Sequence, residues 1–279
     1  MTTIPAYELS DGSSLPAVGF GTYPLRGREG TDAVLSAIDL GYRLLDTAVN
    51  YRNEDAVGAA VRETKVPRSE LLIATKLPGR DHGYEETISS FHGSLQALGL
   101  DRIDLYLIHW PNPSVDKFVD SWKAMIQLQQ EGLVRSIGVS NFTQAFLDRL
   151  KAETGVLPAV NQVELHPYFP QTDLIAYHED NGIRTEAWSP LGKRSAPFDE
   201  DPVAQAAKAH DISPAQVVLR WHHQRGVLPI PKSATPERQR ANIDIFDFEL
   251  TADEVAAITA LGRPDGRLFD GDPNTHEEM

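Results

Sequence analysis

The sequence contains no cysteine, and its cationic side chains are outnumbered. Zero cysteines among 279 residues exclude disulfides, thiolate nucleophiles and thiolate metal ligands, and a location in the reducing cytoplasm fits this count. Lysine and arginine total 26 against 40 aspartates and glutamates, so the net charge of −14 argues against nucleic acid or an anionic membrane as partner. Neither a membrane-spanning apolar run nor the basic-then-apolar pattern of a secretion signal is found.

Short apolar runs alternate with amphipathic helical segments along most of the chain. Helical spacing of apolar residues is found, for example, over residues 31–40, 53–64, 87–98, 117–130 and 214–224. Eight runs have the length and composition of strands: residues 17–20, 42–45, 71–75, 103–108, 136–139, 160–164, 184–187 and 228–230. Apolar strands without polar alternation indicate a parallel sheet buried on both faces. The sequence therefore predicts an α/β fold, a (β/α)8 TIM barrel.

An open doubly wound sheet is the alternative architecture. It would place a Gly-rich phosphate loop after the first strand, but Pro24 stands where the third glycine of that fingerprint belongs. The barrel is therefore favoured, as a single domain over residues 1–279. A hairpin is predicted over residues 7–16 and an extra helix over 251–261, from an Asp-Gly turn and a Thr-Ala-Asp-Glu cap. The acidic stretch from about 265 to 279 is predicted to be a solvated, mobile tail.

Polar side chains follow one predicted strand after another. Asp46, Lys76, His109 and Ser140 are separated by 30, 33 and 31 residues, which is about one strand–helix unit each time. Because barrel strands end at one common face, these side chains are expected around a single mouth. Tyr51 lies in the polar loop after Asp46. We interpret Asn53 and Glu54, further along the chain, as no more than the start of a helix.

A tyrosine, a lysine, an acid and a histidine around one mouth suit proton donation to oxygen. Tyrosine alone has a pKa of about 10, too high for easy proton donation at neutral pH. The Lys76 ammonium lowers that pKa when it lies nearby, and the Asp46 carboxylate keeps the ammonium charged. A neutral His109 imidazole can then orient a carbonyl oxygen. The set suits protonation of an alkoxide as a hydride arrives.

Other chemistries have less support from the sequence. Glycoside hydrolysis needs two acids at strand ends, and only Asp46 and Glu164 are candidates. A serine nucleophile is expected in a Gly-x-Ser-x-Gly turn, and the sequence contains no such motif. The histidines show no ligand spacing, so no metal site is predicted. We interpret His166 as structural and the pair His222-His223 as surface residues.

Five segments, in order along the chain, resemble the aldo-keto reductase family. They are Asp-Thr-Ala-Val-Asn-Tyr-Arg-Asn-Glu at 46–54, Ile-His-Trp-Pro at 108–111, and the runs 138–142, 161–167 and 230–233. The resemblance implies a (β/α)8 barrel that binds NADPH without a Rossmann fold. It also implies a catalytic tetrad: Tyr51 as general acid, Lys76 lowering its pKa, Asp46 pairing with Lys76, and His109 orienting the carbonyl.

The same resemblance implies the cofactor contacts. The nicotinamide carboxamide would be bonded by Ser140, Asn141 and Gln162, and its ring stacked on Trp188. The pyrophosphate would lie along Ser189, Leu191 and Gly192. The 2′-phosphate would be surrounded by Lys232, Ser233 and Arg238. At the adenine, Asn242 would act without a second partner, because Ala241 stands where relatives carry a carboxylate. This predicts weaker binding of the adenine.

Within the family the likeness is to bacterial members of the 2,5-diketo-gluconate reductase type. It implies an open aromatic pocket for small aldehydes, α-dicarbonyls and keto-sugars, lined by Tyr23, Trp110 and Phe269. A non-catalytic NADPH-binding barrel with a regulatory role is the alternative function. A monomer is expected.

Overall fold

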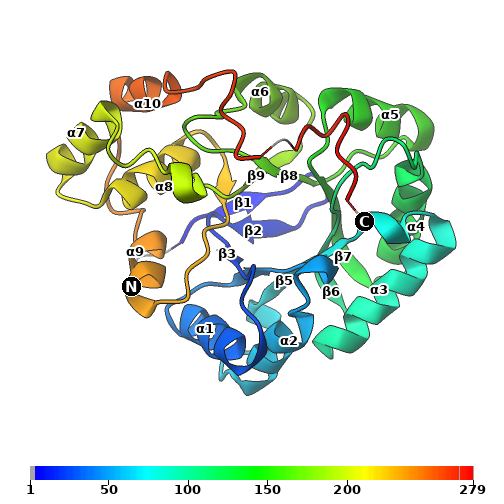
Figure 1. Cartoon of the computed structure of the whole chain (residues 1–279). Coiled ribbons are helices and arrows are strands. Elements are labelled where there is room, and N and C mark those ends of the chain that lie inside the picture. Colours follow the sequence, from blue (N-terminus) through cyan, green and yellow to red (C-terminus); the bar gives the residue numbers. More distant parts are fainter. Residues whose placement is uncertain (1–3, 270, 279) are drawn as a thin grey trace.

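Eight parallel strands form one curled sheet at the centre of the molecule (Figure 1). The computed structural model describes residues 4–269 and 271–278. The strands are neighbours in chain order: β3 (Phe20–Gly21), β4 (Leu44–Asp46), β5 (Leu72–Leu77), β6 (Ile103–Ile108), β7 (Val134–Ser140), β8 (Val160–Glu164), β9 (Arg184–Trp188) and β10 (Leu228–Pro229). The predicted ranges of β6 and β8 are confirmed, and the other strands are shifted by one to three residues at their ends.

Backbone hydrogen bonds close this sheet into a barrel. Gly19 N–H donates to Pro229 O at 3.1 Å and Gly21 N–H donates to Pro231 O at 3.0 Å, so the first strand meets the last. The strands follow one another in chain order, without the reversal of an open doubly wound sheet, so the predicted (β/α)8 barrel is confirmed.

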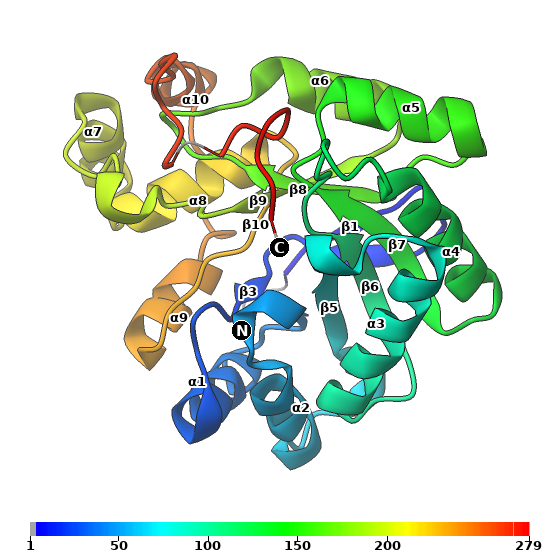
Figure 2. The ribbon, with the colours of Figure 1, turned by 45° about the vertical axis from the view of Figure 1, so that its right-hand side comes forward.

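Helices surround the barrel, as the two views of the ribbon show (Figures 1 and 2). All six residues of β6 are buried, which is expected of a strand covered by a helix layer on one side and a filled interior on the other. On α4, the side chains of Phe118, Trp122 and Met125 recur at helical spacing and are fully buried in the largest apolar cluster. The helices are α1 (Gly27–Asp39), α2 (Glu54–Glu63), α3 (Tyr84–Leu98), α4 (Phe118–Gln130), α5 (Gln144–Thr154), α6 (Thr172–Asp180), α7 (Asp201–His210), α8 (Pro214–Gln224), α9 (Pro236–Ile243) and α10 (Ala252–Thr259).

The predicted hairpin and extra helix are both present. Strands β1 (Ala6–Glu8) and β2 (Ser14–Pro16) pair antiparallel, and the buried Leu9 and Leu15 belong to the same apolar cluster as the barrel residues Leu44 and Leu105. The hairpin therefore packs against one end of the barrel interior. Helix α10 begins with a capping box between Thr251 and Glu254, as its sequence predicts. Among the described helices none has the length and apolarity to span a membrane.

The segment after α10 crosses the mouth of the barrel, where Figure 1 shows it as the red end of the ribbon. Leu268 N–H donates to the Glu164 carboxylate at 2.6 Å, and the ring of His276 lies 4.2 Å from that of Trp110. The prediction of a solvated tail is therefore wrong for these described residues, because aromatic and backbone groups of the segment have partners at the mouth. Its mobility and the single-domain assignment stay predictions.

Candidate active site

Consecutive strands bring four predicted side chains to one mouth. Asp46 ends β4, Tyr51 ends the short 3₁₀ helix η1 (Val49–Tyr51), Lys76 lies in β5, and His109 follows β6. Lys76 is fully buried, and its Nζ donates to both Asp46 oxygens at 2.7 Å and to Thr47 O at 2.9 Å. The same nitrogen lies 3.4 Å from the Tyr51 hydroxyl. The spacing argument grouped Asp46, Lys76 and His109. The loop position added Tyr51, and the structure places all four together.

The protonation of Tyr51 follows from two opposed effects. Burial raises the pKa of the phenol and outweighs the lowering by Lys76, so the net pKa lies above its ordinary value. Burial lowers the pKa of Lys76, but Asp46 and Tyr51 outweigh that effect and the ammonium is retained. The sequence argument considered only the effect of Lys76 on Tyr51. The structure adds burial, so the phenol is a weaker acid than an exposed tyrosine and Lys76 offsets only part of that effect.

His109 and Tyr51 face each other edge-on, with ring centroids 5.7 Å apart. A carboxylate from the crossing segment joins them: Glu278 Oε1 lies 2.9 Å from His109 Nδ1. Burial raises the pKa of Glu278, but contacts with His109, Asn50 and the Gly79 backbone outweigh it and hold the pKa below its ordinary value. Sequence reasoning missed Glu278, because a carboxylate in an acidic stretch gives no signal of where the segment packs.

Gln162 connects the ion pair to a second buried carboxyl. Its Nε2 donates to Asp46 Oδ2 at 2.9 Å and to Glu186 Oε2 at 2.8 Å. Burial, followed by the charge of Asp46, raises the pKa of Glu186 to about 7. Glu186 was also missed by the sequence reasoning. The available signal was an acid inside the predicted strand over residues 184–187.

The residues predicted at the nicotinamide carboxamide form one hydrogen-bonded set beside this network. Ser140 Oγ donates to Gln162 O at 2.7 Å, and Asn141 Nδ2 donates to His109 O at 2.9 Å. Trp188 Nε1 donates to Asn141 Oδ1 at 2.8 Å. Asn141 has a φ of 63°, in the left-handed region that asparagine tolerates better than most residues. The set carries donors and acceptors suited to an amide.

The predicted phosphate contacts lie on two loops. Ser189 and Gly192 have φ values of 49° and 74°, which turn the chain sharply after β9, and Leu191 packs on the neighbouring apolar cluster. Lys232 and Arg238 are solvent-exposed near the start of α9, while Ser233 and Asn242 are buried beside them. This gives a local cationic surface on an acidic protein.

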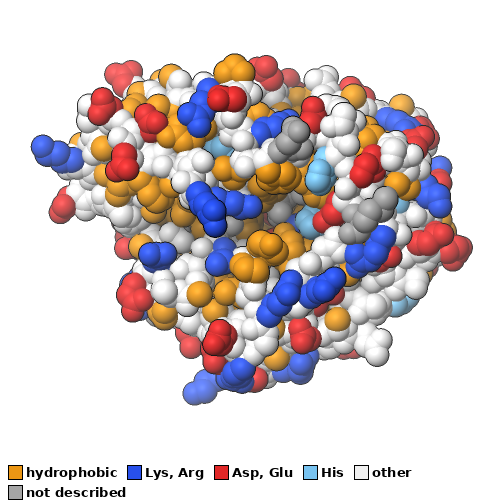
Figure 3. Space-filling model, in the orientation of Figure 1, with side chains coloured by type: hydrophobic (Ala, Val, Ile, Leu, Met, Phe, Trp, Pro, Cys, Tyr) orange, Lys and Arg blue, Asp and Glu red, His pale blue; other side chains and the backbone are white. Residues whose placement is uncertain are grey.

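Aromatic side chains line the hollow in front of Tyr51. Tyr23 is 54% exposed and its ring lies 5.2 Å from that of Tyr51. Trp110 is buried and lies 6.3 Å from Phe269, which stacks on Trp188 at 5.8 Å. The space-filling view shows hydrophobic and cationic side chains around this hollow (Figure 3). The three predicted pocket residues therefore surround one opening.

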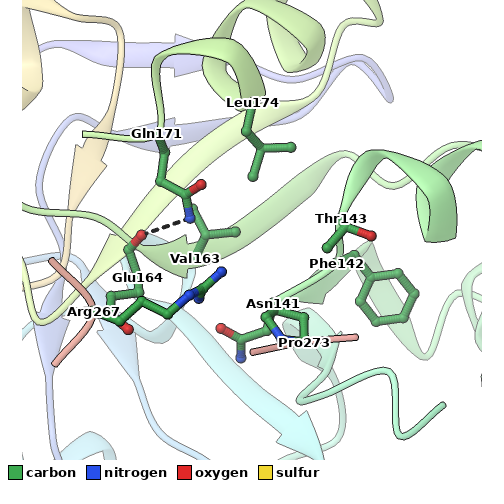
Figure 4. Close-up of a pocket in the computed structure, with 9 residues that line it drawn as sticks. All are labelled: Asn141, Phe142, Thr143, Val163, Glu164, Gln171, Leu174, Arg267 and Pro273. Atoms are coloured by element: carbon green, nitrogen blue, oxygen red, sulfur yellow. Dashed lines mark hydrogen bonds between the residues drawn. The ribbon is translucent and has the colours of Figure 1, made fainter. Parts of the chain in front are cut away.

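A separate cavity of about 40 Å³ lies beside the mouth (Figure 4). Glu164 lines it, and its Oε1 contacts His166 Nε2 at 3.0 Å and accepts from Leu268 N–H at 2.6 Å. Because Asp46 is paired with Lys76 and Glu164 is held by these partners, the arrangement gives no free pair of acids for hydrolysis. His166 is fully buried, so its structural interpretation is confirmed.

Asn53 and Glu54 do start helix α2, but both also hold buried contacts, and the surface interpretation of His222 is wrong. Asn53 Nδ2 donates to Thr22 O, Thr22 Oγ1 and Leu25 O, and its Oδ1 accepts from Thr47, so it ties the loop after β4 to the loop after β3. Glu54 is likewise buried, accepting from Thr75 Oγ1 at 2.6 Å. His222 is buried, not on the surface, with Nε2 3.0 Å from Pro190 O. Within residues 4–269 and 271–278, no cluster of three His, Asp or Glu is placed to hold a metal.

Comparison with known proteins is consistent with this geometry. The model of the Aldo/keto reductase family matches residues 17–263. The chain is 60% identical to 2,5-diketo-D-gluconic acid reductase B from Corynebacterium sp. over 279 residues, covering 100% of both chains. It is 43% identical to methylglyoxal reductase DkgA of Escherichia coli, covering 96% of each. A crystal structure of a Gox0644 mutant in complex with NADPH superposes with a TM-score of 0.94 at 41% identity, covering 99% of this chain and 100% of that one.

Proposed function

This chain belongs to the aldo/keto reductase family, and on that premise we propose that it uses NADPH to reduce small aldehydes, α-dicarbonyls and keto-sugars to alcohols. The observation that carries the proposal is the position of Lys76. Its fully buried ammonium is shared between the Asp46 carboxylate and the Tyr51 hydroxyl at the barrel mouth. A proton donor with a built-in means of stabilising its conjugate base is what carbonyl reduction requires.

The chain's own groups account for the proton half of the reaction. Bound NADPH would supply the hydride to the carbonyl carbon. His109, 5.7 Å from Tyr51 between ring centroids, is placed to orient the carbonyl oxygen at the phenol. Tyr51 would give its hydroxyl proton to the oxygen as negative charge develops there, and the Lys76 ammonium would stabilise the phenolate left behind. Burial raises the pKa of the phenol, and the ammonium beside it offsets part of the cost of releasing the proton.

The residues present fit this cofactor. The amides and hydroxyl of Ser140, Asn141 and Gln162 suit the nicotinamide carboxamide, and the Trp188 indole offers a stacking surface. At the other loop, the exposed Lys232 and Arg238 suit a phosphate, which needs cationic donors, so NADPH is favoured over NADH. These roles are proposals that the relatives' cofactor complexes support.

The non-catalytic barrel gains no support from the site. Burying Lys76 and Asp46 away from water costs free energy that hydrogen bonds and mutual attraction must offset. A protein that only binds NADPH has no use for an ammonium directed at a phenol. The assembled tetrad therefore favours catalysis.

We infer the substrate class from the mouth and from the relatives. The names of two relatives refer to 2,5-diketo-D-gluconic acid and to methylglyoxal, both small dicarbonyl compounds. Tyr23, Trp110 and Phe269 give an open aromatic wall suited to compounds of that size. We also propose a cytoplasmic location, with which the absence of cysteine agrees, and a monomeric state.

The test is NADPH oxidation across a panel of aldehydes, dicarbonyls and keto-sugars. Turnover of the small dicarbonyls by the wild type, lost in Tyr51→Phe, is the expected result. Tight NADPH binding without turnover of any compound in the panel would instead identify a binding protein. Light scattering on the purified chain would test the monomer.

A further inference from the structure

Glu186 is a carboxyl that the tetrad does not explain. It lies in β9 with no exposed surface, beside its register partners Gln162 in β8 and Leu228 in β10. Its Oε2 accepts from Gln162, while its Oε1 is buried without a hydrogen-bond partner among the described residues. A buried, half-satisfied carboxyl costs stability, so its presence beside the active site calls for a functional reason.

The orientation of the Gln162 amide is fixed by what surrounds it. Its Nε2 carries two hydrogens, and one is donated to Asp46 at 2.9 Å and the other to Glu186 at 2.8 Å. Asp46 already accepts two bonds from Lys76 and cannot donate, so the amide nitrogen must face the two acids. The amide oxygen is then the atom that Gln162 presents away from them.

We propose that Glu186 is a positioning residue for hydride transfer, which acts through Gln162 so that the amide oxygen, and not an N–H, meets the nicotinamide carboxamide. This inference rests on the proposed function. An acceptor at that point selects the NH2 end of the carboxamide, and so fixes which face of the nicotinamide ring is turned to the substrate. Catalysis then depends on a residue that touches neither substrate nor cofactor.

The charge of Glu186 gives a second, separable effect. The charged groups that reach it are Asp46 on β4 and Lys76 on β5, while Gln162 on β8 and Leu228 on β10 are uncharged. With Glu186 ionised, two carboxylates oppose one ammonium, and the surplus negative charge favours the cationic ring of NADP+ over the neutral ring of NADPH. Since its pKa is about 7, this preference should grow as the pH rises through neutrality.

Two substitutions separate these effects. Glu186→Gln keeps an oxygen that accepts from Gln162 but removes the charge, whereas Glu186→Leu removes both. Glu54→Gln is the matched control, since Glu54 is a buried carboxyl with a raised pKa that is hydrogen-bonded to Thr75, outside this network. The measured quantities are dissociation constants, by titration calorimetry, for NADPH, NADP+ and the 3-acetylpyridine analogue of NADP+, which lacks the carboxamide NH2.

Wild type and Glu186→Gln should both bind NADP+ roughly tenfold more tightly than the analogue, the size of one hydrogen bond, and Glu186→Leu should lose that preference. Between pH 6 and pH 8 the affinity of the wild type for NADP+ relative to NADPH should rise on the order of fivefold, and Glu186→Gln should show no rise. The Glu54→Gln control should behave as the wild type does in both measurements.

An unchanged preference in Glu186→Leu would overturn the positioning role. If that variant does not fold, Glu186→Met, which is closer in size and offers no comparable acceptor, takes its place with the same two outcomes. A rise with pH in Glu186→Gln equal to that of the wild type would overturn the charge effect alone. In both cases the wild type still binds NADPH and the proposed function stands. Failure of the wild type itself to bind NADPH would remove the proposed function and this inference together.

Discussion

Replacing Glu186 with glutamine is expected to stabilise the folded protein at alkaline pH and leave it unchanged at acid pH. The carboxyl is fully buried, with one oxygen bonded to Gln162 and the other without a partner among the described residues. Glutamine has nearly the same size and keeps an acceptor for Gln162, so the substitution removes a proton-binding group with little change in packing.

The magnitude follows from the pKa. Burial and Asp46 raise the pKa of Glu186 from 4.5 to about 7, so the folded state binds this proton more tightly than the unfolded state. Between those two values only the folded state holds the proton, and stability falls as the pH rises through that window. A difference of about 2.5 pH units at about 1.4 kcal/mol each gives a loss of roughly 3 to 4 kcal/mol, complete above pH 7. Glutamine binds no proton, so the variant does not undergo this loss of stability.

The assay is urea unfolding of the wild type and of Glu186→Gln, without cofactor, at several pH values from about 4.5 to 8. The difference in unfolding free energy should grow from near zero to roughly 3 to 4 kcal/mol in favour of glutamine, which corresponds to roughly 6 °C in melting temperature. If the unfolding free energies of the two proteins keep a constant difference across this pH range, Glu186 has the same pKa in the folded and unfolded states. That result would refute the reasoning.

Four further changes test the site. Tyr51→Phe should lower carbonyl reduction on the order of 10³-fold while the NADPH dissociation constant stays within error; loss of binding as well would mean a structural role. Arg238→Ala should weaken NADPH roughly tenfold and NADH little, and equal weakening would contradict the 2′-phosphate assignment. Ala241→Glu should tighten NADPH about threefold if a carboxylate there anchors adenine, as calorimetry would reveal. Glu278→Gln should lower the KM for a neutral dicarbonyl roughly threefold, because the carboxylate 2.9 Å from His109 then competes less; an unchanged KM would place Glu278 outside the substrate's path.

The sequence was sufficient for the barrel and for the tetrad because both depend on local patterns. Apolar runs of strand length recur at regular intervals, and the residue after each run lies at the same face of the ring. Asp46, Lys76 and His109 could therefore be grouped from spacing alone, and the structure places them together. Spacing alone did not identify Tyr51, which was recognised from its position in the loop after Asp46.

Contacts across the barrel interior were not predictable in this way. Gln162 and Asp46 are 116 residues apart and meet because the ring closes, which no local period records. Glu186 escaped notice for the same reason, whereas Glu278 lies in an acidic segment whose sequence does not indicate where it packs. His222 is a different case: it lies four residues after the buried Val218 on α8, so helical spacing placed it on the apolar face, and its polar character was given too much weight.

The two hydrogen bonds that join residues 19 and 21 to 229 and 231 have a consequence for how the protein is made. A nascent chain leaves the ribosome with its first barrel strand already synthesised, but the partner strand follows about two hundred residues later. Throughout that interval the open edge of β3 is available for pairing with other chains, and closure must bring together the most distant strands of the sheet. Slow refolding and aggregation of shortened chains are therefore expected, with premature termination anywhere before residue 229 leaving a sheet that cannot close.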